Sequence, residues 1–95
     1  MIIRQGNRVQ INGPVTLDNV ATLVAEPAVF EGDSSVIVDL SGMSIADSSA
    51  LSLMLEWVRR YGGSGRRIEF ANLGTGLRSL AELYGVLDLI PIAST

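Results

Sequence analysis

The sequence has 95 residues, 47% of them hydrophobic, and a formal net charge of −3 at pH 7. This length suits a single domain spanning residues 1–95, and the acidic balance argues against nucleic acid as the main partner. His, Cys and Lys are absent and all seven basic residues are Arg, so a serine nucleophile has no His or Lys base and a zinc site has no His or Cys ligands. We therefore expect a non-catalytic protein that uses neither a metal nor a cofactor.

The compartment follows from what the sequence lacks. No apolar stretch is long enough to cross a bilayer, and the start, MIIRQGNRVQ, does not have the basic and then apolar pattern of a secretory signal. The absence of Cys agrees with a reducing compartment. We expect a cytoplasmic protein with no direct insertion into a membrane.

Two short strands are predicted near the N-terminus. Residues 8–12, RVQIN, alternate polar and apolar side chains as a half-buried strand does, and residues 2–4 are placed to pair with them. Gly13 and Pro14 favour a turn and are expected to end this strand.

A first helix is predicted from Thr16 onward, because apolar residues then recur at helical spacing. Thr16 or Asp18 is suited to cap its first turn, and Pro27 ends or kinks it. A turn is predicted at residues 31–34, EGDS. The apolar positions of this helix are Leu17, Val20, Leu23 and Val24.

Two further strands are predicted in the centre of the chain. Residues 36–40, VIVDL, form the nearly continuous apolar run that is typical of a strand buried on both faces. Residues 66–73, RRIEFANL, form the other strand, with Ile68 and Phe70 on one face. With the N-terminal pair, this gives about four strands.

Two further helices are predicted, each closed by glycine. The first spans residues 48–61 and stops at Gly62 and Gly63, and the second spans residues 74–85 with Gly85 as its stop. The inward positions of the second are Leu77, Leu80, Ala81 and Tyr84.

The order of these elements is β-β-α-β-α-β-α, with at most a short strand or a docked tail in residues 86–95. Strands that alternate with helices imply parallel pairing and crossover connections. The fold class is therefore α/β, with a mostly parallel central sheet of about four strands and helices packed on it.

The turn formed by Asp47, Ser48 and Ser49 lies between a predicted strand and a predicted helix. Asp and Ser are preferred N-cap residues, but capping does not explain the two additional hydroxyl groups. A phosphoryl group on Ser48 or Ser49 is well placed beside the free amides of a helix N-terminus, apart from repulsion by Asp47. The third interpretation is a docking surface, and catalysis with Asp39 or Asp47 as a base is disfavoured by the missing His, Lys and Cys.

The helix at residues 48–61 has an apolar arc of roughly 200°, wider than an ordinary surface helix needs. Leu53 and Leu55 extend this arc on opposite edges, next to a narrow polar stripe of Ser52, Glu56 and Arg59. The excess either fills the core beneath neighbouring loops or forms a face for docking a protein.

Two glycine-rich stretches do not predict a nucleotide site. GGSGRR, at residues 62–67, lacks the Lys of a phosphate-cradling loop and is typical of a helix stop and turn. GTG, at residues 74–76, opens a helix without the remaining glycine of the dinucleotide fingerprint. Arg66 and Arg67 are expected to be solvated charges at the edge of a strand.

The central segment resembles that of STAS domains, the fold of bacterial anti-sigma-factor antagonists. In VIVDLSGMSIADSSALSLMLEW, at residues 36–57, a strand ending in Asp-Leu-Ser leads to an Asp-Ser-Ser turn and a helix. INGPVTLDNV, at residues 11–20, stands where the family has its Gly, a short polar segment and its first helix. The predicted order of elements also agrees, so the resemblance implies the STAS fold for most of the chain.

The C-terminal half resembles the MlaB branch of this family, the STAS subunits of Mla-type phospholipid ABC transporters. In that branch a strand ending in Asn-Leu leads to a helix carrying Leu-Ala-x-Leu-Tyr. The resemblance implies a non-catalytic subunit at the cytoplasmic side of the inner membrane that binds the transporter's ATPase and supports outer-membrane lipid asymmetry. The matching residues here are Asn72, Leu73, Leu80, Ala81, Leu83 and Tyr84.

The resemblance also implies roles for single residues. Asp47 caps the helix and fixes the turn, Ser48 occupies the position of the ATPase contact, and Ser49 occupies the position that is phosphorylated in sporulation-type antagonists. Ala50 stands where that branch has Gly. The alternative function is thus an antagonist switched by phosphorylation of Ser49 or Ser48, whose partner is an anti-sigma serine kinase. The predicted docking face consists of Asp47, Ser48, Ser49, Leu51, Ser52 and Leu55.

Overall fold

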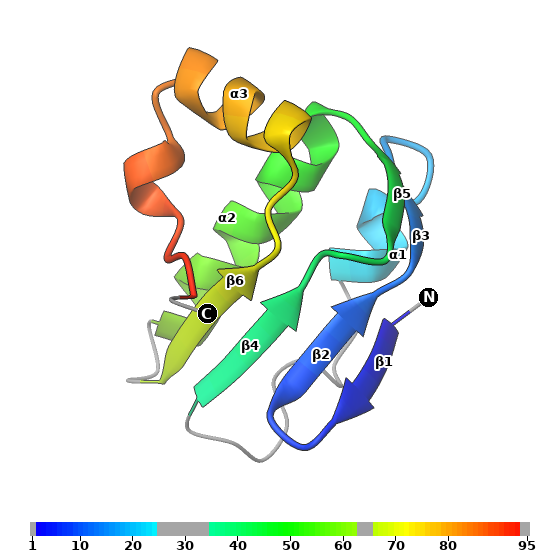
Figure 1. Ribbon diagram of the computed structural model, residues 1–95, viewed down its shortest axis with the longest axis vertical. Helices are drawn as coiled ribbons and strands as arrows, with labels where there is room; N and C mark the ends of the chain where they lie inside the picture. Colours follow the sequence, from blue (N-terminus) through cyan, green and yellow to red (C-terminus); the bar gives the residue numbers. More distant parts are fainter. Residues whose placement is uncertain (1, 25–34, 63–65, 94–95) are drawn as a thin grey trace.

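The central sheet has four strands. A computed structural model describes residues 2–24, 35–62 and 66–93. β1 runs antiparallel to β2, whereas β2, β4 and β6 are parallel to one another (Figure 1). The predicted sheet of four mostly parallel strands is therefore confirmed. In sheet order the strands are β1 (Ile2–Gln5), β2 (Arg8–Ile11), β4 (Ser35–Asp39) and β6 (Arg67–Ala71).

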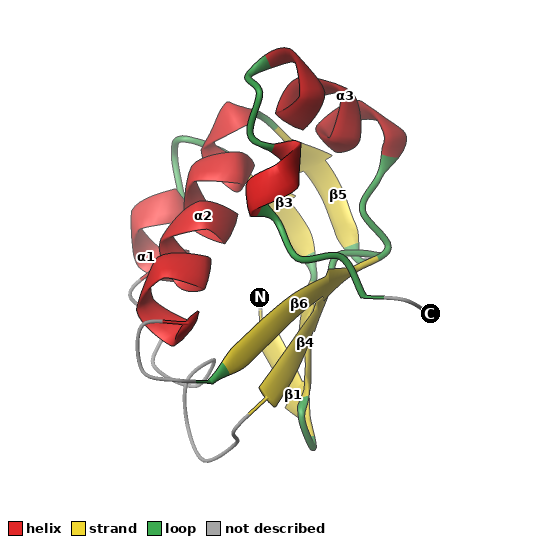
Figure 2. Cartoon of the chain, turned by 90° about the vertical axis from the view of Figure 1, so that its left-hand side faces the viewer, coloured by secondary structure: helices red, strands yellow, loops and turns green. Residues whose placement is uncertain are grey.

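Two helices lie side by side on one face of this sheet. They are α1 (Val20–Val24) and α2 (Ser48–Gly62), and Figure 2 shows both on the same side of the strands. The third helix, α3 (Thr75–Leu83), lies beyond the carboxyl end of β6 and also packs against α2 (Figure 1). Among the described residues no helix covers the opposite face of the sheet (Figure 2).

The core fills the space between the sheet and these helices. Every second residue of each strand points to the covered face, so Val9, Val38 and Phe70 are fully buried. Trp57 and Tyr61 of α2 are the largest of the fully buried side chains.

The wide apolar arc of α2 is explained in large part by this core. Leu51 and Leu53 are 3% and 1% exposed, so they pack inside the protein. Leu55 and Val58 are only partly buried and pack against the edge of the core. Core filling, the first of the two interpretations, therefore accounts for most of the arc.

A second sheet, of two strands, was not predicted. It consists of β3 (Gly13–Val15) and β5 (Met43–Ala46), which pair in parallel. Gly13 has a φ of 91°, which lets the chain leave β2 and enter a new strand where a stop was predicted. Gly42, just before β5, passes close to residues 11 and 12. A Cβ at this position would overlap the Asn12 side chain and come within 2.9 Å of the Ile11 carbonyl oxygen, so this close approach requires glycine.

The first helix begins later than predicted. The Asn19 side chain accepts a hydrogen bond from the Thr16 amide (2.9 Å) and donates one to the Pro14 carbonyl (2.8 Å), so residues 16–19 form a turn and α1 starts at Val20. The Thr16 carbonyl also accepts hydrogen bonds from the Asn19 and Val20 amides (3.1 and 3.0 Å), as the carbonyl of an N-cap does, so of the two predicted caps the contacts support Thr16, at the head of the turn that leads into α1. Leu17, predicted to lie on the apolar face of the helix, is 76% exposed. Pro27, Gly63 and the turn at residues 31–34 lie outside the described residues.

The last helix and the tail follow the prediction with one exception. Gly85, with a φ of 69°, ends α3, and the amide of Val86 donates to the Ala81 carbonyl (2.9 Å). Tyr84, predicted to point inward, is the C-cap of α3 and is 55% exposed.

The C-terminal tail docks on the edge of β6. The Phe70 amide donates to the Pro91 carbonyl, and the Ala93 amide donates to the Phe70 carbonyl, both at 2.9 Å. A short 3-10 helix (Leu87–Leu89) leads to this contact. The docked tail that the sequence allowed is therefore present.

Candidate functional site

Asp47 closes the N-terminus of α2. Its Oδ1 accepts a hydrogen bond from the Ser49 amide at 2.8 Å, and its backbone carbonyl accepts one from the Ala50 amide at 3.0 Å, as in an N-cap. Its Oδ2 accepts a hydrogen bond from the Leu17 amide at 3.2 Å. The Ser49 amide is the main cause that lowers the pKa of Asp47, and partial desolvation opposes it. Asp47 thus joins the turn before α1 to the start of α2.

The two serines after Asp47 differ in exposure. Ser48 is exposed, whereas Ser49 is half-buried and its hydroxyl interacts with the Asp47 carboxylate. Ser52 is exposed one helical turn after Ser48, and Leu55 is partly buried a further turn along. Because residues three and four apart share a helix face, Ser48, Ser52 and Leu55 form one edge of α2.

Two exposed apolar residues beside this edge were not among the predicted site residues. Leu17 is 76% exposed and is held at Asp47 through its amide, and Ile45 of β5, two residues before Asp47, is 64% exposed. Leu51, which was included in the predicted docking face, is buried and supports this region from beneath. We call the turn surface the four exposed residues Leu17, Ile45, Ser48 and Ser52 together with the half-buried Asp47.

The sequence contained little that could have identified Leu17 and Ile45. Leu17 fits the helical repeat of the residues after it, so periodicity placed it inside. Ile45 lies among serines, between the strand predicted at residues 36–40 and the turn predicted at Asp47, where no element was predicted. The pairing of β3 with β5 brings Leu17 to Asp47, whereas Ile45 is already its neighbour in the sequence.

A second aspartate, Asp39, lies at the carboxyl end of β4 and connects it to the first residue of β2, Arg8, and to Asn72, directly after β6. Its Oδ1 accepts hydrogen bonds from the Ser41 amide and from Asn72 Nδ2, both at 2.9 Å. Its Oδ2 accepts from Arg8 Nε at 3.2 Å and from Arg8 Nη2 at 3.1 Å. Asn72 has a φ of 60°, a left-handed conformation that Asn tolerates better than most residues.

Burial by itself raises the pKa of Asp39, since the side chain is only 13% exposed. Hydrogen bonds from Asn72, Ser41 and Arg8 outweigh this cost, and the pKa lies well below its ordinary value of 3.8. A carboxylate that stays ionised and is fully engaged in this way is suited to structure and poorly suited to act as a base.

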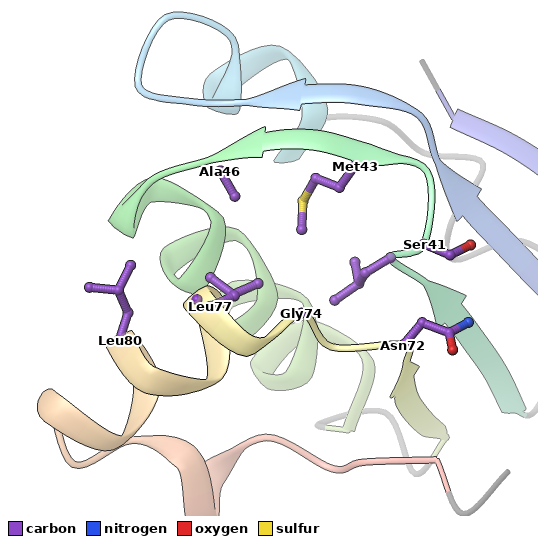
Figure 3. A pocket seen from close by; sticks show the side chains of 9 residues that line it. Ser41, Met43, Ala46, Asn72, Gly74, Leu77 and Leu80 are labelled. Carbon is purple, nitrogen blue, oxygen red and sulfur yellow. The ribbon is translucent and has the colours of Figure 1, made fainter.

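A cavity of about 410 Å³ lies between β5 and the start of α3. Figure 3 shows Met43 and Ala46 on one side of it and Leu77 and Leu80 on the other. Ala46, which lines this cavity, immediately precedes Asp47 in the sequence.

The described residues contain no group of three or more His, Cys, Asp or Glu side chains that could hold a metal ion. Each helix within them falls short of the length and hydrophobicity that crossing a membrane requires. Arg67 pairs with Glu69 at the surface, as expected, but Arg66 stacks on the Tyr61 ring, 4.4 Å from its centre.

Solved structures with the same fold include two of an anti-sigma-factor antagonist. The chain is 19% identical to SpoIIAA in its unphosphorylated form, with a TM-score of 0.73 over 99% of this chain and 87% of that chain. It is 16% identical to the phosphorylated form from Bacillus, with a TM-score of 0.69 over 99% and 90%. A structure of Mglu in its native form is 21% identical, with a TM-score of 0.52 over 73% and 22%. At these identities the similarity concerns the fold.

The family comparison is more specific. No curated protein matches the chain, but residues 3–91 match a family model described as an Mlab, STAS domain. The match includes the Asp39 cluster, the turn surface and the cavity. STAS domains engage in protein–protein interactions and are typically non-catalytic regulatory proteins. The chain belongs to the STAS-domain family.

Proposed function

We propose that this chain is a docking subunit that binds its partner through the turn surface. The observation that carries this proposal is the exposure of Leu17 and Ile45 around a turn that Asp47 holds in place. Large apolar side chains that gather at the surface beside polar groups are typical of protein interaction sites. Ser48 and Ser52 supply exposed hydroxyl groups on the adjoining edge of α2.

The partner that we propose is the ATPase subunit of an Mla-type ABC complex that moves phospholipid and maintains outer-membrane lipid asymmetry. The match to the MlaB-type family and the resemblance of the segment ANLGTGLRSLAELYG, at residues 71–85, support this choice. The chain would then lie at the cytoplasmic side of the inner membrane through its partner and act without catalysis of its own. The partner, and not this chain, would bind the nucleotide.

Ser48→Arg tests the proposal in co-expression with that ATPase. The new side chain places a bulky charge at the centre of the turn surface, so we expect ATPase capture to fall at least about tenfold. Ser79→Arg is the matched control, since Ser79 is exposed on α3 and belongs to no part of the turn surface. Capture by Ser48→Arg equal to that of the control, at an unchanged melting temperature, would refute the docking assignment.

A second function is supported by the similarity to SpoIIAA, whose structure is known with and without phosphate. In this alternative a kinase phosphorylates Ser49 or Ser48, and the turn acts as the switch of an anti-sigma-factor antagonist. The Ser49 hydroxyl already interacts with Asp47, so a phosphate there would repel this carboxylate and disturb the cap.

Affinity purification from the native host separates the two functions. An ABC ATPase on unmodified protein supports the docking subunit. A serine kinase, together with phosphate on Ser49 or Ser48 in the recovered peptides, supports the antagonist and rejects the transporter.

A further inference from the structure

Asp18 carries a charge that the fold itself does not use. Of the two predicted helix caps it is the one that the contacts do not support, and its side chain is exposed. Within the described residues its carboxylate takes part in no hydrogen bond and no ion pair. Asp47, by contrast, has both oxygens engaged by the amides of Ser49 and Leu17. Asp18 is therefore the carboxylate that this region leaves free for a partner.

The turn that carries Asp18 is held in place on either side of it. The Asn19 side chain accepts a hydrogen bond from the Thr16 amide at 2.9 Å, and the Asn19 amide donates to the Thr16 carbonyl at 3.1 Å. The Leu17 amide donates to the Asp47 carboxylate at 3.2 Å. Because the backbone is fixed before and after Asp18, a contact with this residue requires little further ordering of the chain.

The surroundings of Asp18 indicate the chemistry of its partner. Leu17, the preceding residue, is 76% exposed, and Ile45 of the same turn surface is 64% exposed. Exposed apolar side chains bordered by a polar or charged group are typical of the centre and the rim of a protein interface. A phosphate group or an anionic lipid headgroup would be repelled by Asp18. The matching occupant is a protein surface that combines apolar residues with a cationic side chain.

The arginines of this chain do not supply that cation. Across residues 2–24, 35–62 and 66–93, every ion pair joins an arginine to an acid other than Asp18: Arg8 to Asp39, Arg59 and Arg60 to Glu56, and Arg67 to Glu69. We propose that Asp18 pairs with an arginine or lysine of the ATPase at the rim of the turn surface and so contributes to the choice of partner. This inference rests on the proposed function, because it names the chemistry of the partner at the same surface.

Asp18→Arg tests the pairing in the co-expression assay. The substitution brings two like charges together, so we expect capture of the ATPase to fall at least about tenfold. Asp88→Arg is the matched control, since Asp88 is also an exposed acid that forms no ion pair in the described part of the chain. It lies in the 3-10 helix, on the left of Figure 1, whereas the turn before α1 lies on the right. Both variants change the net charge equally, so an equal fall in both would overturn the pairing.

The salt dependence of binding separates pairing from a local structural role. Asp18 lies just before α1, where a negative charge also favours the helix. For Asp18→Asn we expect the Kd for the purified ATPase to rise about two- to fivefold at low salt, with an unchanged melting temperature. Raising NaCl from about 50 to about 300 mM should slow association less for this variant than for the wild type. A lower melting temperature with an unchanged salt dependence would assign Asp18 to the helix and overturn the pairing.

The failure of this inference differs from the failure of the proposed function. If Ser48→Arg loses ATPase capture and Asp18→Arg does not, the turn surface remains the docking site and the pairing is wrong. If the wild type itself does not capture the ATPase, the proposed function is wrong and the pairing fails with it.

Discussion

Two aspartates lie at strand ends, Asp39 as the last residue of β4 and Asp47 directly after β5. Each has a pKa below its ordinary value, but their surroundings differ. Asp39 is buried and accepts hydrogen bonds from Arg8, Ser41 and Asn72, so its charge is used within the protein. Asp47 lies near the surface and accepts hydrogen bonds from the backbone amides of Leu17 and Ser49. The next residue, Ser48, is exposed.

The difference shows how one chain separates stability from recognition. The Asp39 cluster joins the start of β2 to the carboxyl ends of β4 and β6, and its loss would disturb the central sheet. Asp47 joins two peripheral turns and fixes the positions of Leu17 and Ser48, which belong to the turn surface. Substitutions in the first region should therefore act mainly on folding, and those in the second mainly on binding.

The largest effect on stability is expected from Asp39→Ala. The substitution leaves Arg8 and Asn72 without their shared acceptor and removes an ionised group that three neighbours had stabilised. We expect the free energy of unfolding to fall by about 2–4 kcal/mol, measured by urea denaturation. Asp18→Ala, at an exposed position, is the control and should change it little. A result for Asp39→Ala no larger than the control would mean that the cluster is not structural.

A smaller loss is expected from Gly42→Ala, at the turn between the two regions. The added methyl group would collide with the Asn12 side chain and with the Ile11 carbonyl, so β5 or β2 must shift. We expect a loss of about 1–3 kcal/mol in the free energy of unfolding. Gly76→Ala, where the methyl group meets open space, should be neutral or slightly stabilising in the same assay. Equal stability of the two variants would contradict the close approach at Gly42.

Much of the central sheet could be predicted from sequence because its strands carry strong signals. VIVDL is apolar at every position except Asp39, since β4 lies between two other strands and helices cover one of its faces; Ile37, on the other face, is only partly buried. RIEFA alternates because its Ile68 and Phe70 face the core. The small sheet could not be predicted. β3 is three residues long and begins with Gly13 and Pro14, and β5 contains a single strongly apolar β-branched residue, Ile45.

The candidate site was predictable only where it depends on residues close together in the sequence. Asp47 and the two serines are local signals, since a helix cap is decided within a few residues of the chain. Leu17 becomes a neighbour of Asp47 only through the pairing of β3 with β5, which is a long-range contact, and the exposure of Ile45 follows from the place of β5 in that small sheet. The cavity likewise depends on where β5 and α3 lie, and no periodicity within either segment encodes that distance.

The loss of stability at acidic pH is expected to depend on Asp39. The pKa of folded Asp39 lies below its ordinary value of 3.8, so the stabilising contribution is complete above about pH 5 and is lost as the pH falls through 3.8 toward the folded pKa. By pH 3 the free energy of unfolding should have fallen by about 1 kcal/mol through Asp39, because Asp39 is protonated at this pH in the unfolded chain and still ionised in the folded protein. Thermal unfolding between pH 6 and pH 3 should show a weaker loss for Asp39→Asn than for the wild type. Parallel curves for the two proteins would contradict this assignment.

Of the two aspartate-to-alanine substitutions, Asp47→Ala is expected to have the smaller effect on stability and the larger effect on binding of the partner. The variant removes the cap of α2 and the bond to the Leu17 amide. Because the carboxylate is near the surface, water replaces part of what is lost, so stability should fall less than in Asp39→Ala. Without these bonds Leu17 and Ser48 are free to move. At a temperature where both variants are folded, ATPase capture should therefore fall more for Asp47→Ala than for Asp39→Asn. Asp47→Asn, which retains an acceptor for the Ser49 amide, should restore much of the binding. Rescue of stability without rescue of binding would show that the charge of Asp47, and not only its geometry, contributes to recognition.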